Sequence, residues 1–282
     1  MWGAVRARSR RAAGLVAGLA VTAIASPALA QLCHDHGLAP AAPAPKPEVK
    51  EQSSAGTSTP VVPPPAPAIS YAAGLGVETA QIAGGSYTGL SPRLAVRWRR
   101  LAAEASLPVF RLALGDTRTG LGDAVLAASA RLARVGGVDL TAVASASVPT
   151  GDHHHGFGMG HIMAMPGMVA AAGHTLRVTG TVTFGAALTG TGHEHMVNVV
   201  APMNRTELTG GVAAAYAVTP TLAPELSAAM SEPIGDGVRR AAAGVGATAW
   251  FGAWQLRAAA QLGLAGDPYN TRVVLQGSVR LP

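Results

Sequence analysis

The feature that most constrains the fold is an alternation of polar and apolar residues over segments of about ten positions, repeated along most of the chain. The clearest segment runs from His174 to Gly185. Its polar set is Thr175, Arg177, Thr179, Thr181 and Thr183, and its apolar set is Leu176, Val178, Val182 and Phe184. A helix would mix the two sets, because its apolar period is 3.6 residues rather than 2. The pattern therefore predicts β-strands with one polar and one apolar face.

Segments of this kind follow one another from residue 69 onward, separated by turns rich in Gly, Asp, Asn and Pro. We predict about twelve strands, at residues 69–81, 91–100, 103–114, 122–134, 138–149, 162–172, 174–187, 205–217, 221–231, 237–250, 253–264 and 271–281. An even number of antiparallel strands is typical of a bacterial barrel that closes on itself. The predicted fold class is therefore all-β, an antiparallel transmembrane β-barrel.

The connections between these strands alternate in length. The short ones lie near Leu101-Ala102, Val135-Gly136-Gly137, Gly173, Val218-Thr219-Pro220 and Phe251-Gly252. The longer ones are Ile82–Leu90, Gly115–Leu121, Thr150–His161, Leu188–Arg205, Glu232–Asp236 and Ala265–Asn270. Short periplasmic turns and long external loops are typical of outer-membrane barrels. With the first strand starting in the periplasm, every long connection falls outside.

The N-terminal part of the chain has the features of a leader and a linker. Residues 1–30 combine a basic start, an apolar stretch and the sequence Ala28-Leu29-Ala30, which together predict a cleaved signal peptide. Its four arginines account for much of the formal charge of +6, so the mature chain does not indicate a nucleic-acid partner. Residues 31–68 are rich in Pro and Ala and are expected to be a disordered linker. Residues 69–282 form the predicted barrel.

The composition agrees with a membrane location. Charged residues are 13% of the chain, against about 25% in an average soluble protein. No long apolar run follows the leader, so the apolar surface must be spread over alternate residues of strands. We therefore expect a Gram-negative outer membrane. The aromatic content of 4% and the ending Leu281-Pro282 argue against it, because such barrels usually carry aromatic girdles and a terminal aromatic residue.

Two short motifs carry a resemblance to a known family. Gly120-Leu121-Gly122-Asp123 opens one predicted strand, and Ala144–Val148 leads into Pro149-Thr150-Gly151-Asp152 about 25 residues later. This pair resembles the outer-membrane barrels described as MetA-pathway-of-phenol-degradation proteins or transporters, over about Tyr71 to Leu281. The resemblance implies passage of small, often hydrophobic molecules across the outer membrane. In both motifs we expect glycine to supply a positive φ and aspartate to cap its own backbone.

Histidine and methionine are concentrated in two predicted external loops. The candidate metal ligands are His153, His154, His155, Met159, His161, His193, His195 and Met196, with a second group, Cys33, His34 and His36, near the mature N-terminus. Imidazole and thioether together suit copper best, and zinc and nickel are alternatives. We expect an exposed patch that captures or filters metal ions. The competing interpretation is a solvated His-rich loop, with methionines such as Met163 and Met168 as apolar filler.

The charged residues on the polar faces form the other candidate set. The predicted lumen-lining residues are Arg97, Arg99, Arg131, Arg177, Glu207, Glu225, Arg257 and Arg272, and Arg93, Arg111, Arg280, Glu78 and Asp139 share their strands' polar faces. An interior ladder of Arg and Glu would shape a polar pore and bias it toward anions. The alternative is that these charges pair across the lumen and plug it.

These patterns predict a function. We expect an outer-membrane channel or transporter for small molecules, with a link to copper or another transition metal through the His/Met-rich loops. The alternative is a non-transporting metal-binding surface or periplasmic β protein. No Ser/His/acid set or nucleotide motif can be assembled, so we expect no enzymatic activity and no required cofactor. The partners expected are outer-membrane lipid and a small-molecule or metal-ion substrate.

Overall fold

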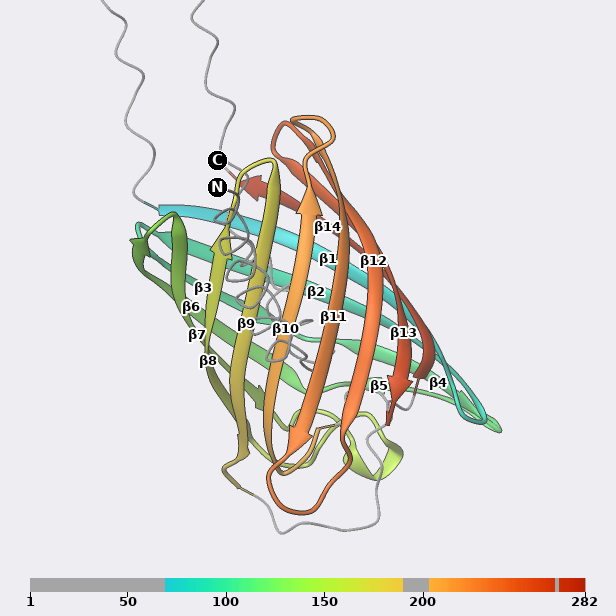
Figure 1. The fold of residues 1–282 in the computed structure, drawn as a ribbon. Coiled ribbons are helices and arrows are strands. Elements are labelled where there is room, and N and C mark those ends of the chain that lie inside the picture. The colour runs from blue at the N-terminus through green and yellow to red at the C-terminus, as the bar shows by residue number, and fades with distance from the viewer. Residues whose placement is uncertain (1–68, 190–202, 267–268, 282) are drawn as a thin grey trace, which may run out of the picture.

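The computed structural model describes residues 69–189, 203–266 and 269–281, which form one antiparallel sheet (Figure 1). The strands are β1 (Ile69–Ile82), β2 (Gly85–Trp98), β3 (Leu101–Ser106), β4 (Val109–Leu114), β5 (Asp116–Leu121), β6 (Ala124–Val135), β7 (Val138–Val148), β8 (Met163–Ala172), β9 (Leu176–Ala187), β10 (Thr206–Tyr216), β11 (Leu222–Pro233), β12 (Arg240–Phe251), β13 (Trp254–Ala265) and β14 (Tyr269–Leu281), with one 3₁₀ turn, η1 (His153–His155). Within these residues no helix is long and apolar enough to cross a membrane.

The sheet closes because β1 pairs on both of its edges. One edge pairs with β2, from Ile69↔Trp98 to Ile82↔Gly85, and the other pairs with β14, from Tyr71↔Leu281 onward. The result is a closed antiparallel barrel of twelve strands with two extra strands, which confirms the predicted fold class. The predicted signal peptide, the predicted linker and its Cys33, His34 and His36 lie outside the described residues.

One of the predicted strands is broken in the structure, and an additional strand precedes another. The expected strand 103–114 is β3 and β4, interrupted at Leu107-Pro108, and both pieces pair with β2. The expected strand 122–134 is β6 alone, and β5 lies before it in the predicted loop Gly115–Leu121, separated from β6 by Gly122-Asp123. β6 pairs with β7, whereas β5 pairs with β4 alone among the described strands. The β4–β5 hairpin therefore extends beyond the regular wall.

The connections differ at the two ends of the barrel, as Figure 1 shows. At one end, here called the short-turn end, all five connections are brief, as predicted. The opposite end is called the loop end. There the first two predicted long loops are wrong: β2 starts at Gly85, and β5 occupies Asp116–Leu121. Gly84 and Gly115, with φ of 83° and 82°, allow tight turns, so these stretches continue as strands.

Burial along the strands is inverted relative to that of a water-soluble protein. The outward-facing apolar side chains are exposed, with Leu94 at 66% and Leu226 at 64%. The inward-facing polar side chains are buried, with Glu207 and Ser231 at 0%. In β9 the predicted polar set Arg177 to Thr183 faces inward and the apolar set faces outward. An apolar outer wall around a polar interior is what a barrel in lipid requires.

Candidate functional site

Among the described residues, three Arg–Glu ion pairs lie on the inner wall of the barrel. Arg240 pairs with Glu207 at 2.5 Å and Arg257 pairs with Glu225 at 2.9 Å. Arg272 of β14 pairs with Glu78 of the adjacent β1. Each pair joins adjacent strands or strands with one strand between them. In each of these pairs the opposite charges therefore neutralise one another along the wall.

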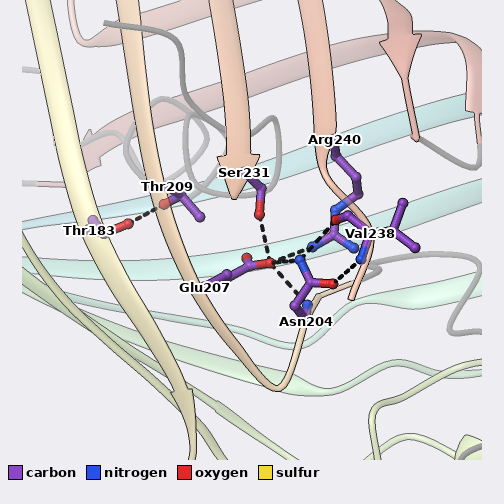
Figure 2. Close-up of polar contacts among 7 residues, drawn as sticks. All are labelled: Thr183, Asn204, Glu207, Thr209, Ser231, Val238 and Arg240. Atoms are coloured by element: carbon purple, nitrogen blue, oxygen red, sulfur yellow. Dashed lines mark hydrogen bonds and ion pairs between the residues drawn. The ribbon is translucent and has the colours of Figure 1, made fainter. Parts of the chain in front are cut away.

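The Glu207 pair is part of a buried network near the loop end (Figure 2). Oε2 of Glu207 accepts hydrogen bonds from Ser231 Oγ at 2.7 Å and Arg240 Nη2 at 2.5 Å. It also accepts from the backbone N and Nδ2 of Asn204, at 3.0 and 2.8 Å. The neighbouring hydroxyls of Thr183 and Thr209 bond to each other. One carboxylate thus connects β10, β11 and β12.

Asn204 extends this network to the β11–β12 loop. Its Oδ1 accepts from Val238 N at 2.9 Å, and its Nδ2 donates to Val238 O at 3.0 Å. The side chain therefore imitates a strand partner for a loop residue. Two connections at the loop end are held together through Glu207 as a consequence.

The interior of the loop end contains an apolar cluster on the β1, β2, β4 and β14 side. The cluster consists of Ala80, Ile82, Tyr87, Phe110, Leu112, Phe157 and Tyr269. Tyr87 and Phe110 meet edge to face, with ring centroids 6.0 Å apart. Unlike the other members, which lie on strands, Phe157 belongs to the β7–β8 loop, yet it is only 4% exposed. This loop therefore folds inward and places an aromatic ring inside the mouth of the barrel.

The motif glycines make room for this packing. A Cβ atom at Gly120 would lie 2.6 Å from the Phe157 ring, and one at Gly122 would overlap the Phe110 ring. A Cβ at Gly151 would lie 2.6 Å from the Phe157 carbonyl oxygen. None of these three residues has a positive φ. The predicted turn-forming role is thus wrong for them: they are needed because rings and backbone approach closely.

Asp123 and Thr150 fasten the inward-folded loop to the break between β5 and β6. The Asp123 carboxylate accepts from Gly151 N at 3.1 Å and from Met159 N at 2.7 Å. The Thr150 hydroxyl accepts from Ala124 N and donates to the Gly122 carbonyl, both at 2.8 Å. Asp123 therefore caps a distant segment instead of its own backbone. Asp152 does cap locally, because its carboxylate accepts from His154 N at 3.0 Å.

The predicted lumen-lining residues fall into two groups. Glu207, Glu225, Arg257 and Arg272 are the wall-paired residues, and Arg177 points inward from β9. The short-turn end holds Arg177 and the other three residues: Arg97 near the end of β2, Arg131 in β6 and Arg99 in the β2–β3 turn. Arg99 is a correction, because it has φ of 53° and its guanidinium lies 5.5 Å from the Trp98 ring centroid. It is a turn residue and does not line the lumen.

The predicted metal patch is only partly described. His153 and His154 have ring centroids 3.9 Å apart, and His155 Nδ1 lies 2.5 Å from Asp152 Oδ2, a hydrogen bond that lowers the pKa of Asp152. Burial lowers the pKa of His161. In the part of the chain that the structure describes, no three His, Cys, Asp or Glu residues are grouped as a metal site. His193, His195 and Met196 lie outside that part.

The sequence interpretation missed Phe157, Asp123 and Asn204 as parts of the interior, and it placed Ser231 on a polar strand face without its partner Glu207. A signal for Phe157 was present, because it is an aromatic residue between glycines in a polar loop of a chain with few aromatics. Asp123 was noticed only as part of a turn motif. The roles of Asn204 and Ser231 depend on which strands are neighbours, and alternation within one strand does not contain that information.

Comparison with known proteins defines the class of fold. No protein-family model matches the chain, and no curated protein sequence matches it. The COG4313 outer membrane channel from Pseudomonas putida F1 is 16% identical, with a TM-score of 0.57 over 77% of this chain and 97% of that chain. The NanC porin is 8% identical with a TM-score of 0.53 over 73% and 100%, and the KdgM porin is 9% identical with a TM-score of 0.50 over 74% and 99%. The fold is thus that of outer-membrane channels and porins.

Proposed function

We propose that this protein is a channel or transporter for small molecules in the outer membrane of a Gram-negative bacterium, and not an enzyme. The observation that carries the proposal is the closed barrel with an apolar outer face and an interior whose charges pair along the wall. In these pairs the opposite charges meet along the wall, so the pairs need no bridge across the lumen. The short-turn end then faces the periplasm and the loop end faces outward.

The inward-folded β7–β8 loop supplies the constriction of this channel. Phe157 sits inside the mouth against the apolar cluster, and Asp123 and Thr150 hold the loop there. A solute entering from outside passes an apolar region first and the charged wall afterwards. This order suits small molecules that combine an apolar part with a polar or charged group.

Reconstitution tests the channel. The purified, detergent-folded barrel, added to a planar lipid bilayer in KCl, is expected to give discrete steps of current. The absence of any current over the full range of applied voltages would contradict a channel. Recovery of the protein as a soluble monomer in a periplasmic wash would contradict the membrane location itself.

We also propose that the His/Met-rich loops bind copper, and that zinc or nickel bind more weakly to the same patch. Support comes from the adjacent His153 and His154 rings and from the lowered pKa of His161, since burial favours the neutral imidazole that metals bind. This proposal is independent of transport.

Calorimetry with Cu(II) tests the metal proposal. Binding to the detergent-folded protein is expected to disappear when His153, His154, His155, His193 and His195 are all replaced by alanine. A matched variant, His174→Ala, changes a histidine at the opposite end of the barrel and should bind as the original does. Unchanged binding in the multiple variant would exclude the patch.

A further inference from the structure

A cluster of charged side chains lies at the short-turn end on β6, β7 and β9. In the β6–β7 register, Arg134 is the direct partner of Asp139, and Arg131 pairs with Thr141 beside it. Arg131 Nη2 forms an ion pair with Asp139 Oδ1 at 2.8 Å. The register through β8 sets Asp139 level with Thr179 of β9, so Arg177 is the next inward-facing residue toward the short-turn end.

This cluster differs from the wall pairs in its charge balance. Each of the three wall pairs has one arginine for one glutamate, whereas here the charges of Arg131, Arg134 and Arg177 all act on the single carboxylate of Asp139. Asp139 is already bound by Arg131. The positive charges of the other two arginines are therefore not neutralised by a bonded partner of opposite sign in this cluster.

Arg177 supplies a second, independent observation. Its Nη2 atom is buried and has no hydrogen-bond partner among the described residues. A buried guanidinium N–H without an acceptor is costly, because the group has lost its water without gaining a partner. An oxyanion placed between Arg177 and its arginine neighbours would supply the missing acceptor. Planar guanidinium groups suit carboxylate and phosphate oxygens in particular.

We propose that Arg131, Arg134 and Arg177, with Asp139 as a competing anion, form a binding site for a small oxyanion, a carboxylate or phosphate group, at the short-turn end of the lumen. The negative charge of Asp139 offsets part of the positive charge of the arginines. It therefore keeps the affinity for the oxyanion low enough for the oxyanion to be released. The proposal deepens the proposed function, on which it rests: the site is a charged position that a solute meets near the periplasmic end of the lumen.

The test uses inorganic phosphate and calorimetry on the detergent-folded, full-length protein at low salt. Arg177→Gln is expected to weaken phosphate binding about tenfold, the effect of losing one charge-assisted hydrogen bond. Asp139→Asn is expected to strengthen it, since it removes the competing carboxylate and releases Arg131. Arg239→Gln is the matched control, because it removes the same charge from an exposed arginine at the loop end. It should leave the affinity unchanged.

The opposite signs of the two variants decide the proposal. Equal phosphate affinity in the original protein and Arg177→Gln, or weaker binding in Asp139→Asn, would overturn the site. Calorimetry needs no open pore, so the outcomes separate from those of the bilayer experiment. If phosphate binds with this pattern but the barrel carries no current, the site is supported and the proposed channel function is contradicted. If the barrel carries current but binds no phosphate, the channel function is supported and the site is contradicted.

Discussion

Replacing Glu207 with alanine is expected to lower the free energy of unfolding by about 3–5 kcal/mol, because it leaves a buried charge without its partner. The Arg240 side chain is 6% exposed, and it would lose its 2.5 Å ion pair while staying out of water. Ser231 and Asn204 would lose the same acceptor. The measurement is urea unfolding of the barrel in lipid vesicles, followed by tryptophan fluorescence.

Two further variants isolate the cause of that loss. Glu232→Ala removes a glutamate from an ion pair at the same end, with Arg239, but both side chains are largely exposed, at 42% and 65%. Its expected cost is below about 1 kcal/mol. The double variant Glu207→Leu with Arg240→Met removes both charges and should recover much of the stability. A Glu207→Ala cost as small as that of Glu232→Ala would show that the network does not hold the strands together.

Replacing Phe157 with alanine is expected to raise the conductance of the reconstituted barrel several-fold. The ring is the part of the β7–β8 loop that enters the mouth, and without it the loop loses its apolar anchor to the cluster of Tyr87 and Phe110. Asp123→Ala should act in the same direction, because it removes the acceptor for Gly151 N and Met159 N. Single-channel recording in planar bilayers gives the measurement.

The matched control is Phe184→Ala, the same substitution on the outer face of β9, where the ring is 41% exposed. It should leave the conductance unchanged. Protease digestion from the loop side gives a second readout, since a released loop is cut faster than a docked one. A Phe157→Ala barrel with the original conductance and the original rate of cutting would rule out this loop as the constriction.

The strands were largely predictable because each records its orientation in its own residues. β9 and β11 begin and end within two residues of the predicted bounds. Alternation over that length fixes which residues face inward, because a shift by one residue would turn every side chain to the other face. The break at Pro108 was missed because alternation continues on both sides of it. The first two predicted loops are shorter in the structure because Gly84 and Gly115 allow tight turns, so the residues beside them continue as paired strand.

The interior could be predicted as a set of residues but not as a set of contacts. Parity identified Glu207, Glu225, Arg257 and Arg272 as inward candidates. Their partners follow from the register of strands that are far apart in sequence, as with Glu207 and Arg240, 33 residues apart. The inward-folded loop was harder still. The histidines of this loop predict metal binding, whereas its buried residue, Phe157, has an apolar side chain that carries no such signal.

The closure of β1 on β14 has a consequence for how the chain reaches this structure. Glu78 and Arg272, which bond across that seam, are 194 positions apart, and contacts of such separation form slowly because a long loop must first close. Until the last strand arrives, both β1 and β13 present open edges that can pair with other chains. The barrel is therefore prone to aggregation until β14 has been synthesised and paired. A chain shortened before Tyr269 would keep the open edges of β1 and β13 permanently.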